Sequence, residues 1–220
     1  MSTQTCVLIF AFSIASIMTA SSNKLPMKER ILATADRLFY QRGIQAVGVD
    51  TIAAEVGISK RTLYNHFPSK NDLVAAYLIG RSDQLPPSEK PPDEQILWNF
   101  DRMDRAFATS EFRGCPFINA IGELGNNADR DIKRIARQFK EDRLAWFRDR
   151  LRELKVEAAE ELAAQLQMLI DGAIAANVVR GDKSAARAAK QMARLLLRNA
   201  GVKLDDKAKP QNKPQRHTRA

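Results

Sequence analysis

Apolar residues recur at intervals of three and four along most of the chain, which is the spacing of an α-helix with one buried face. The first such segment, 27–42, is expected to form a helix that ends at Gly43. Its buried face would consist of Ile31, Leu32, Ala35, Leu38 and Phe39. No stretch alternates between apolar and polar residues as a strand would, so the pattern predicts an all-α protein with about nine helices.

Three further helices are expected next, over 49–56, 60–66 and 69–84. Gly57 breaks the first of them, and Pro68 cannot continue the second. The stretch 85–93 contains four prolines and is the clearest linker in the chain. Beyond it, helical spacing predicts five more helices, over 94–109, 117–124, 130–154, 157–179 and 184–199.

The residues from Val49 to Lys70 read VDTIAAEVGISKRTLYNHFPSK, and two short helices joined by a glycine-containing turn form a helix-turn-helix. Gly57 permits the left-handed backbone that the tight turn needs. Apolar residues would lock the two helices against the first one. The polar side chains of the second helix would then suit a DNA major groove, where they read base edges and phosphates. These side chains are Ser59, Lys60, Arg61, Thr62, Tyr64, Asn65 and His66.

At these residues the chain resembles the TetR family of transcriptional regulators. The resemblance is carried by Ile52-Ala53, Gly57, Ser59, Thr62-Leu63-Tyr64, His66-Phe67 and Ser69-Lys70, and upstream by Ala35, Leu38, Phe39 and Gly43. It implies a three-helix DNA-binding domain, followed by a helical bundle that binds a ligand and dimerises. The family's ligand-binding half varies greatly, so the resemblance says little about the second half of this chain.

The resemblance also implies roles for single residues. The positions that correspond to phosphate contacts are Tyr64, His66 and Lys70. The positions that correspond to base reading or groove lining are Lys60, Arg61 and Thr62. Family members often carry a phosphate-contacting threonine near the start of the second helix, where this chain has Val47 and Gly48. Thr51 would have to replace that contact.

Plainer interpretations exist for the same residues. Tyr64 could pack on Pro68 or on the fourth helix, and His66 could be a surface or capping histidine. The whole motif could be two packed helices that bind nothing, although the polar residues of the second helix would then need another explanation.

The chain carries a formal net charge of +9 and has a pI of about 9.8, which favours polyanionic partners. Part of this positive charge lies in residues 203–220, which contain two prolines and few apolar side chains. This tail is predicted to be disordered. It could contact DNA without sequence preference or simply be solvated.

The first 23 residues carry no charged side chain. Cys6 to Met18 is largely apolar, but it is too short to span a bilayer comfortably and lacks the charged leading region of a signal peptide. We expect a translation start at Met27 or Met18. A genuine N-terminal arm and a membrane-associating segment are the alternatives.

The second half of the chain shows no catalytic constellation, metal-ligand spacing or phosphate loop, so no enzyme activity and no cofactor are expected. The only cysteines are Cys6 and Cys115, which fits a reducing cytoplasm. Cys115 could sense thiol-reactive compounds or be a buried structural residue. Residues that could line a largely apolar ligand pocket, or simply form the core, are Trp98, Met103, Phe107, Cys115, Phe117, Phe139 and Trp146.

The last two predicted helices have the character of a dimer surface. The apolar stripe of 162–174 is too wide for an exposed helix, and small residues in both helices permit close approach. The alternative is that these helices cover the core of their own chain. The expected organisation is an N-terminal extension at 1–26 and a DNA-binding domain with a connecting helix at 27–84. A ligand-binding and dimerisation domain at 94–200 and a basic tail at 201–220 would follow.

The sequence therefore predicts a cytoplasmic homodimer that binds a palindromic DNA operator and represses transcription until an unidentified small molecule releases it. No membrane partner is expected. One alternative is a protein that binds DNA without sequence preference and without an inducer. The other is a helical protein-interaction module, or an enzyme, that retains the motif without binding DNA.

Overall fold

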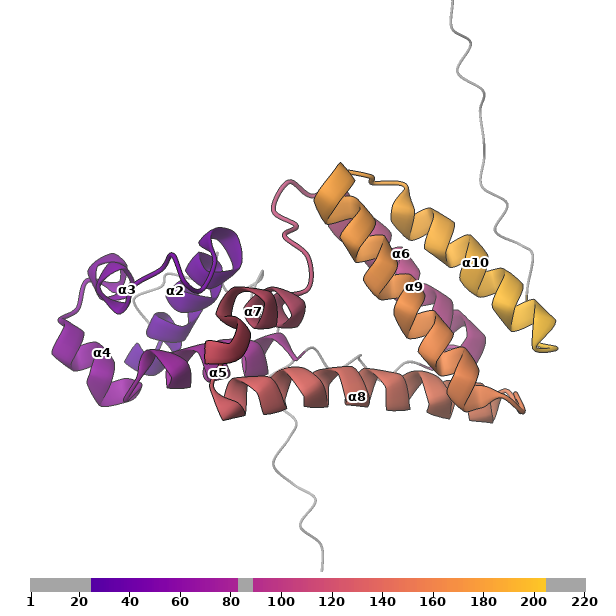
Figure 1. The fold of residues 1–220 in the computed structure, drawn as a ribbon, viewed down its shortest axis with the longest axis horizontal. Helices are drawn as coiled ribbons and strands as arrows, with labels where there is room; N and C mark the ends of the chain where they lie inside the picture. Colours follow the sequence, from indigo (N-terminus) through magenta and orange to yellow (C-terminus); the bar gives the residue numbers. More distant parts are fainter. Residues whose placement is uncertain (1–24, 83–88, 205–220) are drawn as a thin grey trace, which may run out of the picture. The chain divides into compact units, whose positions relative to one another are not determined.

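The computed structural model describes residues 25–82 and 89–204. Over these residues it contains nine α-helices, one short 3-10 helix and no strand, which confirms the all-α fold (Figure 1). The helices are α2 (Met27–Arg42), α3 (Val49–Val56), α4 (Lys60–His66), α5 (Lys70–Arg81), α6 (Pro92–Ala108), α7 (Pro116–Leu124), η2 (Gly125–Asn127), α8 (Arg130–Glu153), α9 (Ala159–Arg180) and α10 (Ala185–Asn199).

The predicted bounds of α2, α3 and α4 are confirmed. Two helices begin earlier than expected, because each has a proline in its first turn. α6 starts at Pro92 and α7 at Pro116, where the missing N–H would have had no helical partner in any case. The predictions for the N-terminal extension up to residue 24, for 83–88 and for the tail from 205 onward lie outside the described residues.

The described residues form two compact units, one of 25–82 with 113–141 and the other of 89–112 with 142–204. α7 and the first half of α8 thus group with the DNA-binding helices, whereas the division expected from the sequence assigned them to the second domain. The sequence predicted a single boundary at the proline-rich linker 85–93. After α6, however, residues 113–141 belong again to the first unit.

The core of the first unit forms where α2 packs against α3 and α5. The rings of Phe39 on α2 and Tyr77 on α5 meet edge to face, with their centroids 5.7 Å apart. Side chains with no exposed area include Ile31, Leu38, Ile52, Leu63 and Leu73, which come from four different helices. The apolar spacing seen in the sequence therefore corresponds to one shared core.

Hydrogen bonds hold α7 and the residues just before it in the first unit. The hydroxyl of Tyr40 donates to the carbonyl of Gly114 at 3.1 Å and accepts from the backbone N–H of Arg113 at 3.0 Å. The Glu123 carboxylate accepts from the backbone N–H of Gln45 at 3.2 Å. A Cβ added at Gly43, which has φ +93°, would lie 2.9 Å from Oε2 of Glu123, so the close approach of α7 requires glycine there.

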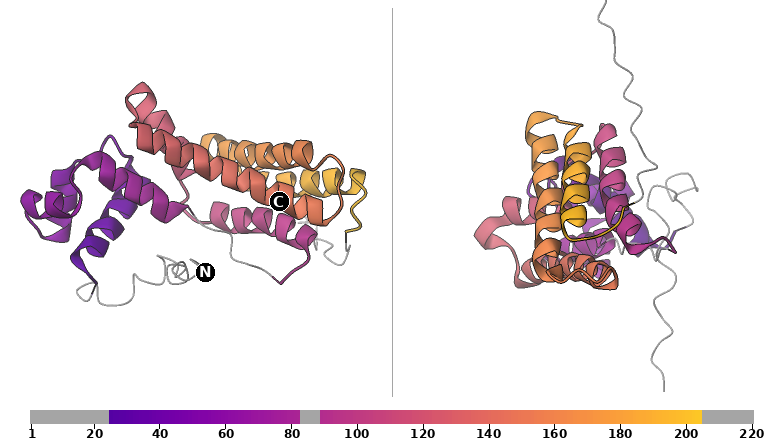
Figure 2. Two further views of the ribbon diagram at one scale, coloured as in Figure 1. Left: turned by 90° about the horizontal axis from the view of Figure 1, so that it is seen from below. Right: turned by 90° about the vertical axis from the view of Figure 1, so that its right-hand side faces the viewer.

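In the second unit, α10 packs against both α6 and α9, and the right-hand view of Figure 2 shows the three helices side by side. The rings of Phe100, Phe107 and Phe147 are fully buried in this core. Ion pairs join α10 to α6 at the rim. Lys190 lies 2.6 and 2.7 Å from the two carboxylate oxygens of Asp101, and Arg187 lies 2.9 Å from Asp104.

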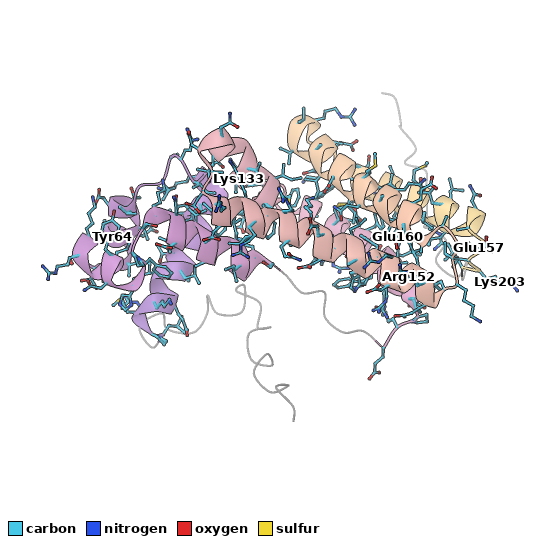
Figure 3. The ribbon with its side chains drawn as sticks, turned by 60° about the horizontal axis from the view of Figure 1, so that its bottom comes forward. Tyr64, Lys133, Arg152, Glu157, Glu160 and Lys203 are labelled. Carbon is cyan, nitrogen blue, oxygen red and sulfur yellow. The ribbon has the colours of Figure 1, made fainter. Side chains whose placement is uncertain are left out.

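The turn from α8 to α9 is fixed by backbone and charged contacts. Lys155 has φ 60°, and the N–H of Val156 bonds the carbonyl of Leu151 at 3.0 Å, as at a left-handed helix end. Arg152 reaches Glu160 at 2.6 Å across the turn, where Figure 3 shows both side chains. This turn directs α9 back along the second unit.

Candidate nucleic-acid interface

The turn between α3 and α4 depends on the backbone of Gly57. This residue is left-handed, with φ 78°, and its N–H bonds the carbonyl of Ala54 at 3.1 Å, while that of Ile58 bonds Ala53 at 2.9 Å. A Cβ at position 57 would meet nothing within 4 Å. Glycine is therefore needed here for its backbone conformation rather than for space.

α4 begins with a side-chain cap. The Ser59 hydroxyl accepts from the backbone N–H of Thr62 at 3.0 Å, and the two hydroxyl oxygens lie 2.9 Å apart. Such a cap stabilises a helix by about 1 kcal/mol. Both residues were predicted to contact DNA, and their hydroxyls have this local role in the free protein.

Apolar residues anchor α4 by one face only. Leu63 has no exposed area and Phe67 is 3% exposed, with the ammonium of Lys28 5.5 Å from the Phe67 ring centroid. The opposite face carries the side chains of Lys60, Arg61, Tyr64 and Asn65, all of which are exposed. Tyr64, labelled in Figure 3, is 38% exposed, so part of its ring is open to a partner.

The two neighbouring cations of α4 differ in their partners. Lys60 lies 3.1 Å from Asp50 of α3, and this hydrogen bond, together with the carboxylate charge, raises the pKa of Lys60. Arg61 makes no hydrogen bond or ion pair within the described parts of the chain. The guanidinium of Arg61 is therefore ready to bind an external acceptor, whereas Lys60 would have to leave Asp50. Asp50 was not predicted from the sequence as a partner of Lys60.

α5 starts at the same surface. Ser69 accepts from the N–H of Asp72 at 3.1 Å and donates to its carboxylate at 2.7 Å, which confirms the predicted capping residues. Lys70 follows the cap and is half-buried. Partial burial lowers its pKa, while the charge of Glu123 opposes the shift.

The other predicted DNA contacts lie at the margins of this surface. Thr51 is exposed in the first turn of α3, and His66 is half-buried in the last turn of α4. The acidic side chain of Glu55 in α3 is paired with Arg37 of α2. α4 therefore carries two cations and no acidic residue, while two carboxylates of the neighbouring α3 are held in ion pairs.

The residues proposed for a ligand pocket fall into both units. Trp98, Met103, Phe107 and Trp146 belong to the second unit, where Met103 and Phe107 are buried in the core. Cys115, Phe117 and Phe139 belong to the first unit. The rings of Phe117 and Phe139 stack at 3.8 Å, and Cys115 is buried with 8% exposure. For Cys115 this burial fits the structural alternative better than a reactive thiol.

No cluster of three or more His, Cys, Asp or Glu side chains that could hold a metal ion occurs in 25–82 or 89–204. The geometry of the first unit is instead that of a helix-turn-helix. Its second helix is capped, anchored by one face and cationic on the other.

Comparisons with known proteins agree with this geometry. Residues 31–77 match the family model described as bacterial regulatory proteins of the tetR family. The activator FasR of Mycolicibacterium smegmatis is 44% identical over 66 residues, which are 29% of this chain and 30% of that protein. The repressor BepR of Brucella suis is 27% identical over 184 residues, which are 71% of this chain and 82% of that protein. The matches to FasR and to the uncharacterized regulator YerO of Bacillus subtilis cover only 30% and 20% of those proteins.

Solved structures extend the similarity to most of the chain. A TetR transcriptional regulator from Streptomyces avermitilis is 31% identical and superposes with a TM-score of 0.72. The match covers 81% of this chain and 100% of that chain. A TetR-family regulator from Streptomyces coelicolor is 28% identical, with a TM-score of 0.73 over 79% of this chain and 95% of that chain. These relatives are transcriptional regulators and not enzymes.

Proposed function

This chain belongs to the TetR family, and on that premise we propose that it is a transcriptional repressor that binds a palindromic DNA operator and leaves it when a small molecule binds. The observation that carries the proposal is the exposed face of α4, with Arg61 unpaired within the described residues and Tyr64 beside it. An α-helix such as α4 is about 10–12 Å in diameter with its side chains. It fits a major groove that is about 12 Å wide.

Two exposed stripes on the last helices support a homodimer. On α9, Met168, Gly172, Ala175 and Val179 follow helical spacing and are all exposed, Met168 by 72% and Val179 by 82%. On α10, Ala188, Met192 and Leu195 do the same. A Cβ at Gly172 would meet nothing within 4 Å, so nothing in the described part of its own chain requires glycine there. A second copy packing closely on these helices would bury both stripes.

α9 is also long and apolar enough, by length and composition alone, to cross a membrane, and only 33% of that stretch is buried in one protomer. A dimer accounts for this exposed apolar surface, because each protomer covers the other's α9. We place the protein in the cytoplasm for this reason and because its proposed partner is DNA.

Repression and release rest on analogy and on a physical requirement. BepR, which aligns with most of this chain, is a repressor, whereas FasR is an activator. A ligand can change the spacing of the two α4 helices only if it binds the two states of the dimer with different affinities. We assign such a ligand to the helical part beyond α5. The aromatic and methionine side chains suggested there as a pocket lining favour an apolar molecule.

A binding selection tests the proposal. The full chain is incubated with random duplex DNA at near-physiological salt, and the bound sequences are compared with those selected by Tyr64→Ala/Lys70→Ala. Recovery of a palindrome by the wild type, and its loss in the variant, is the expected result. A matched variant, Thr109→Ala/Lys183→Ala, changes two exposed residues of the second unit and should select the same palindrome. Selection of no preferred sequence by the wild type would overturn the proposal.

A further inference from the structure

A second group of cations lies in the first unit, away from the helix-turn-helix motif. Arg130, Lys133, Arg134 and Arg137 occupy the first two turns of α8 and, with Ala128, line a surface groove of about 490 Å³. All four side chains are exposed, and Figure 3 marks Lys133 among them. We call these four residues the α8 basic stripe.

Internal contacts neutralise little of this charge. Arg134 lies 3.2 Å from Asp131, but both side chains of this pair are about two-thirds exposed, and water screens such a pair. Lys133 donates to the carbonyl of Asn126 at 3.2 Å, which leaves its charge in place. Arg130 and Arg137 make no hydrogen bond or ion pair within the described ranges.

The α8 basic stripe is unfavourable for the isolated helix. Its members stand three and four residues apart, and like charges at these spacings repel one another on a helix surface. The opposite face of the same turns is apolar and buried, with Ile132, Ile135 and Ala136 in the core. Packing therefore explains why α8 is a helix here, but not why its outer face carries four cations.

We infer that the α8 basic stripe contacts the phosphate backbone of DNA outside the operator. The inference rests on the proposed function, because the stripe belongs to the same compact unit as α4. From Arg130 to Arg137 the helix rises about 10 Å. One DNA strand places a phosphate about every 3.4 Å along its axis, so the stripe matches about three successive phosphates.

The salt dependence of binding on two duplexes tests this inference. One duplex carries only the selected operator, and the other extends it by about 15 base pairs on each side, more than one helical turn. The full chain is compared with Arg130→Gln/Arg134→Gln/Arg137→Gln. On the long duplex, the slope of log K against log salt should become shallower by about 2 to 3, at about 0.9 for each lost phosphate contact. On the short duplex the wild type and the glutamine variant should have the same slope.

Two control variants isolate the charge. Arg130→Lys/Arg134→Lys/Arg137→Lys keeps all three cations and should retain the wild-type slope on the long duplex. Lys155→Gln/Lys183→Gln/Lys203→Gln removes the same charge from exposed positions of the second unit and should also retain it. The inference is overturned if the glutamine variant keeps the wild-type slope on the long duplex. It is also overturned if the slope becomes shallower by the same amount on both duplexes.

Failure of the inference differs from failure of the proposed function. If the selection recovers no operator, two nonspecific duplexes of the same lengths replace the pair, and the charge comparison remains valid. If the operator is recovered but wild type and glutamine variant have the same slope on the long duplex, the proposed regulator function stands. The contact of the α8 basic stripe with DNA is then excluded.

Discussion

Asp36 on α2 and Arg81 in the last turn of α5 form an ion pair with two hydrogen bonds, at 2.5 Å from Nε to Oδ1 and 2.8 Å from Nη2 to Oδ2. The Asp36 side chain is 6% exposed and that of Arg81 is 29% exposed. The guanidinium also lies 4.3 Å from the ring centroid of Tyr40. Burial alone would lower the pKa of Arg81, but the hydrogen bonds and charge of Asp36 outweigh it, so the pKa is raised.

Removal of one partner of this ion pair should destabilise the protein more than removal of both. Arg81→Met leaves the Asp36 carboxylate buried without a counter-charge, and we expect the free energy of unfolding to fall by about 3 kcal/mol. Asp36→Leu/Arg81→Met should recover most of that loss, because no buried charge remains. Urea titration at a fixed protein concentration measures both effects. A double variant as unstable as Arg81→Met would show that the loss comes from packing rather than charge.

Tyr77 should make folding sensitive to alkaline pH. Burial, the largest cause, raises the pKa of its phenol well above the ordinary value, while the charge of Arg81 opposes the shift. A phenol is charged only after it loses its proton, so the unfolded chain ionises first as the pH rises. The contribution of Tyr77 to stability is therefore complete below about pH 10 and is lost above it, by up to about 1.4 kcal/mol per pH unit.

Unfolding of Tyr77→Phe should show a shallower loss of stability than the wild type between pH 10 and 11. Tyr64→Phe, which changes an exposed ring, serves as the matched control and should follow the wild-type curve. If Tyr77→Phe and the wild type lose stability in parallel over this range, the assignment to Tyr77 is incorrect.

Arg61 and Lys70 are two of the three cations of the proposed DNA surface, and they should differ in what they recognise. If Arg61 bonds a guanine edge, Arg61→Ala should weaken operator binding by about 1–3 kcal/mol and leave nonspecific binding nearly unchanged. If Lys70 bonds phosphate, Lys70→Ala should weaken binding to operator and scrambled duplexes alike. Fluorescence anisotropy with both duplexes separates the two effects. An equal loss on both duplexes for Arg61→Ala would assign Arg61 to the backbone instead.

Charge placed within the α9 stripe should abolish the dimer. Val179 is 82% exposed in one protomer, and Val179→Asp would bury an unpaired carboxylate in the proposed interface. We expect a monomer by sedimentation velocity, and weaker operator binding because two α4 helices are no longer linked. Ser110→Asp introduces the same charge at an exposed position outside both stripes and should remain dimeric. A dimeric Val179→Asp would exclude this part of α9 from the interface.

Local signals in the sequence were sufficient to predict the helices of the helix-turn-helix and the turn between them. Gly57 and Ser59 act on their immediate neighbours, so the turn and the start of α4 can be read from residue type and spacing. The grouping of α7 with the first unit could not be read in this way. It depends on contacts between residues far apart in the chain, such as Tyr40 with Gly114 and Gln45 with Glu123.

The same reason explains the missed charged partners. Asp50 and Lys60 are ten residues apart on different helices, and Asp36 and Arg81 are separated by most of the DNA-binding domain. Helical spacing predicts which face is buried, but not which buried or exposed charges will meet across helices. The residues suggested for a ligand pocket were chosen by residue type alone. Residue type does not show which residues lie together, and these residues fall into both units.

The most direct test of the central claim is the ratio of dissociation constants for a scrambled duplex and for the selected operator, measured with the full chain at about 150 mM salt. Specific regulators bind their sites at least about 10³-fold more tightly than other DNA. We predict a ratio of that size for the wild type and a ratio reduced by about 10-fold or more for Arg61→Ala. A wild-type ratio near one would contradict sequence-specific binding by α4 and leave only the affinity of a basic protein for a polyanion.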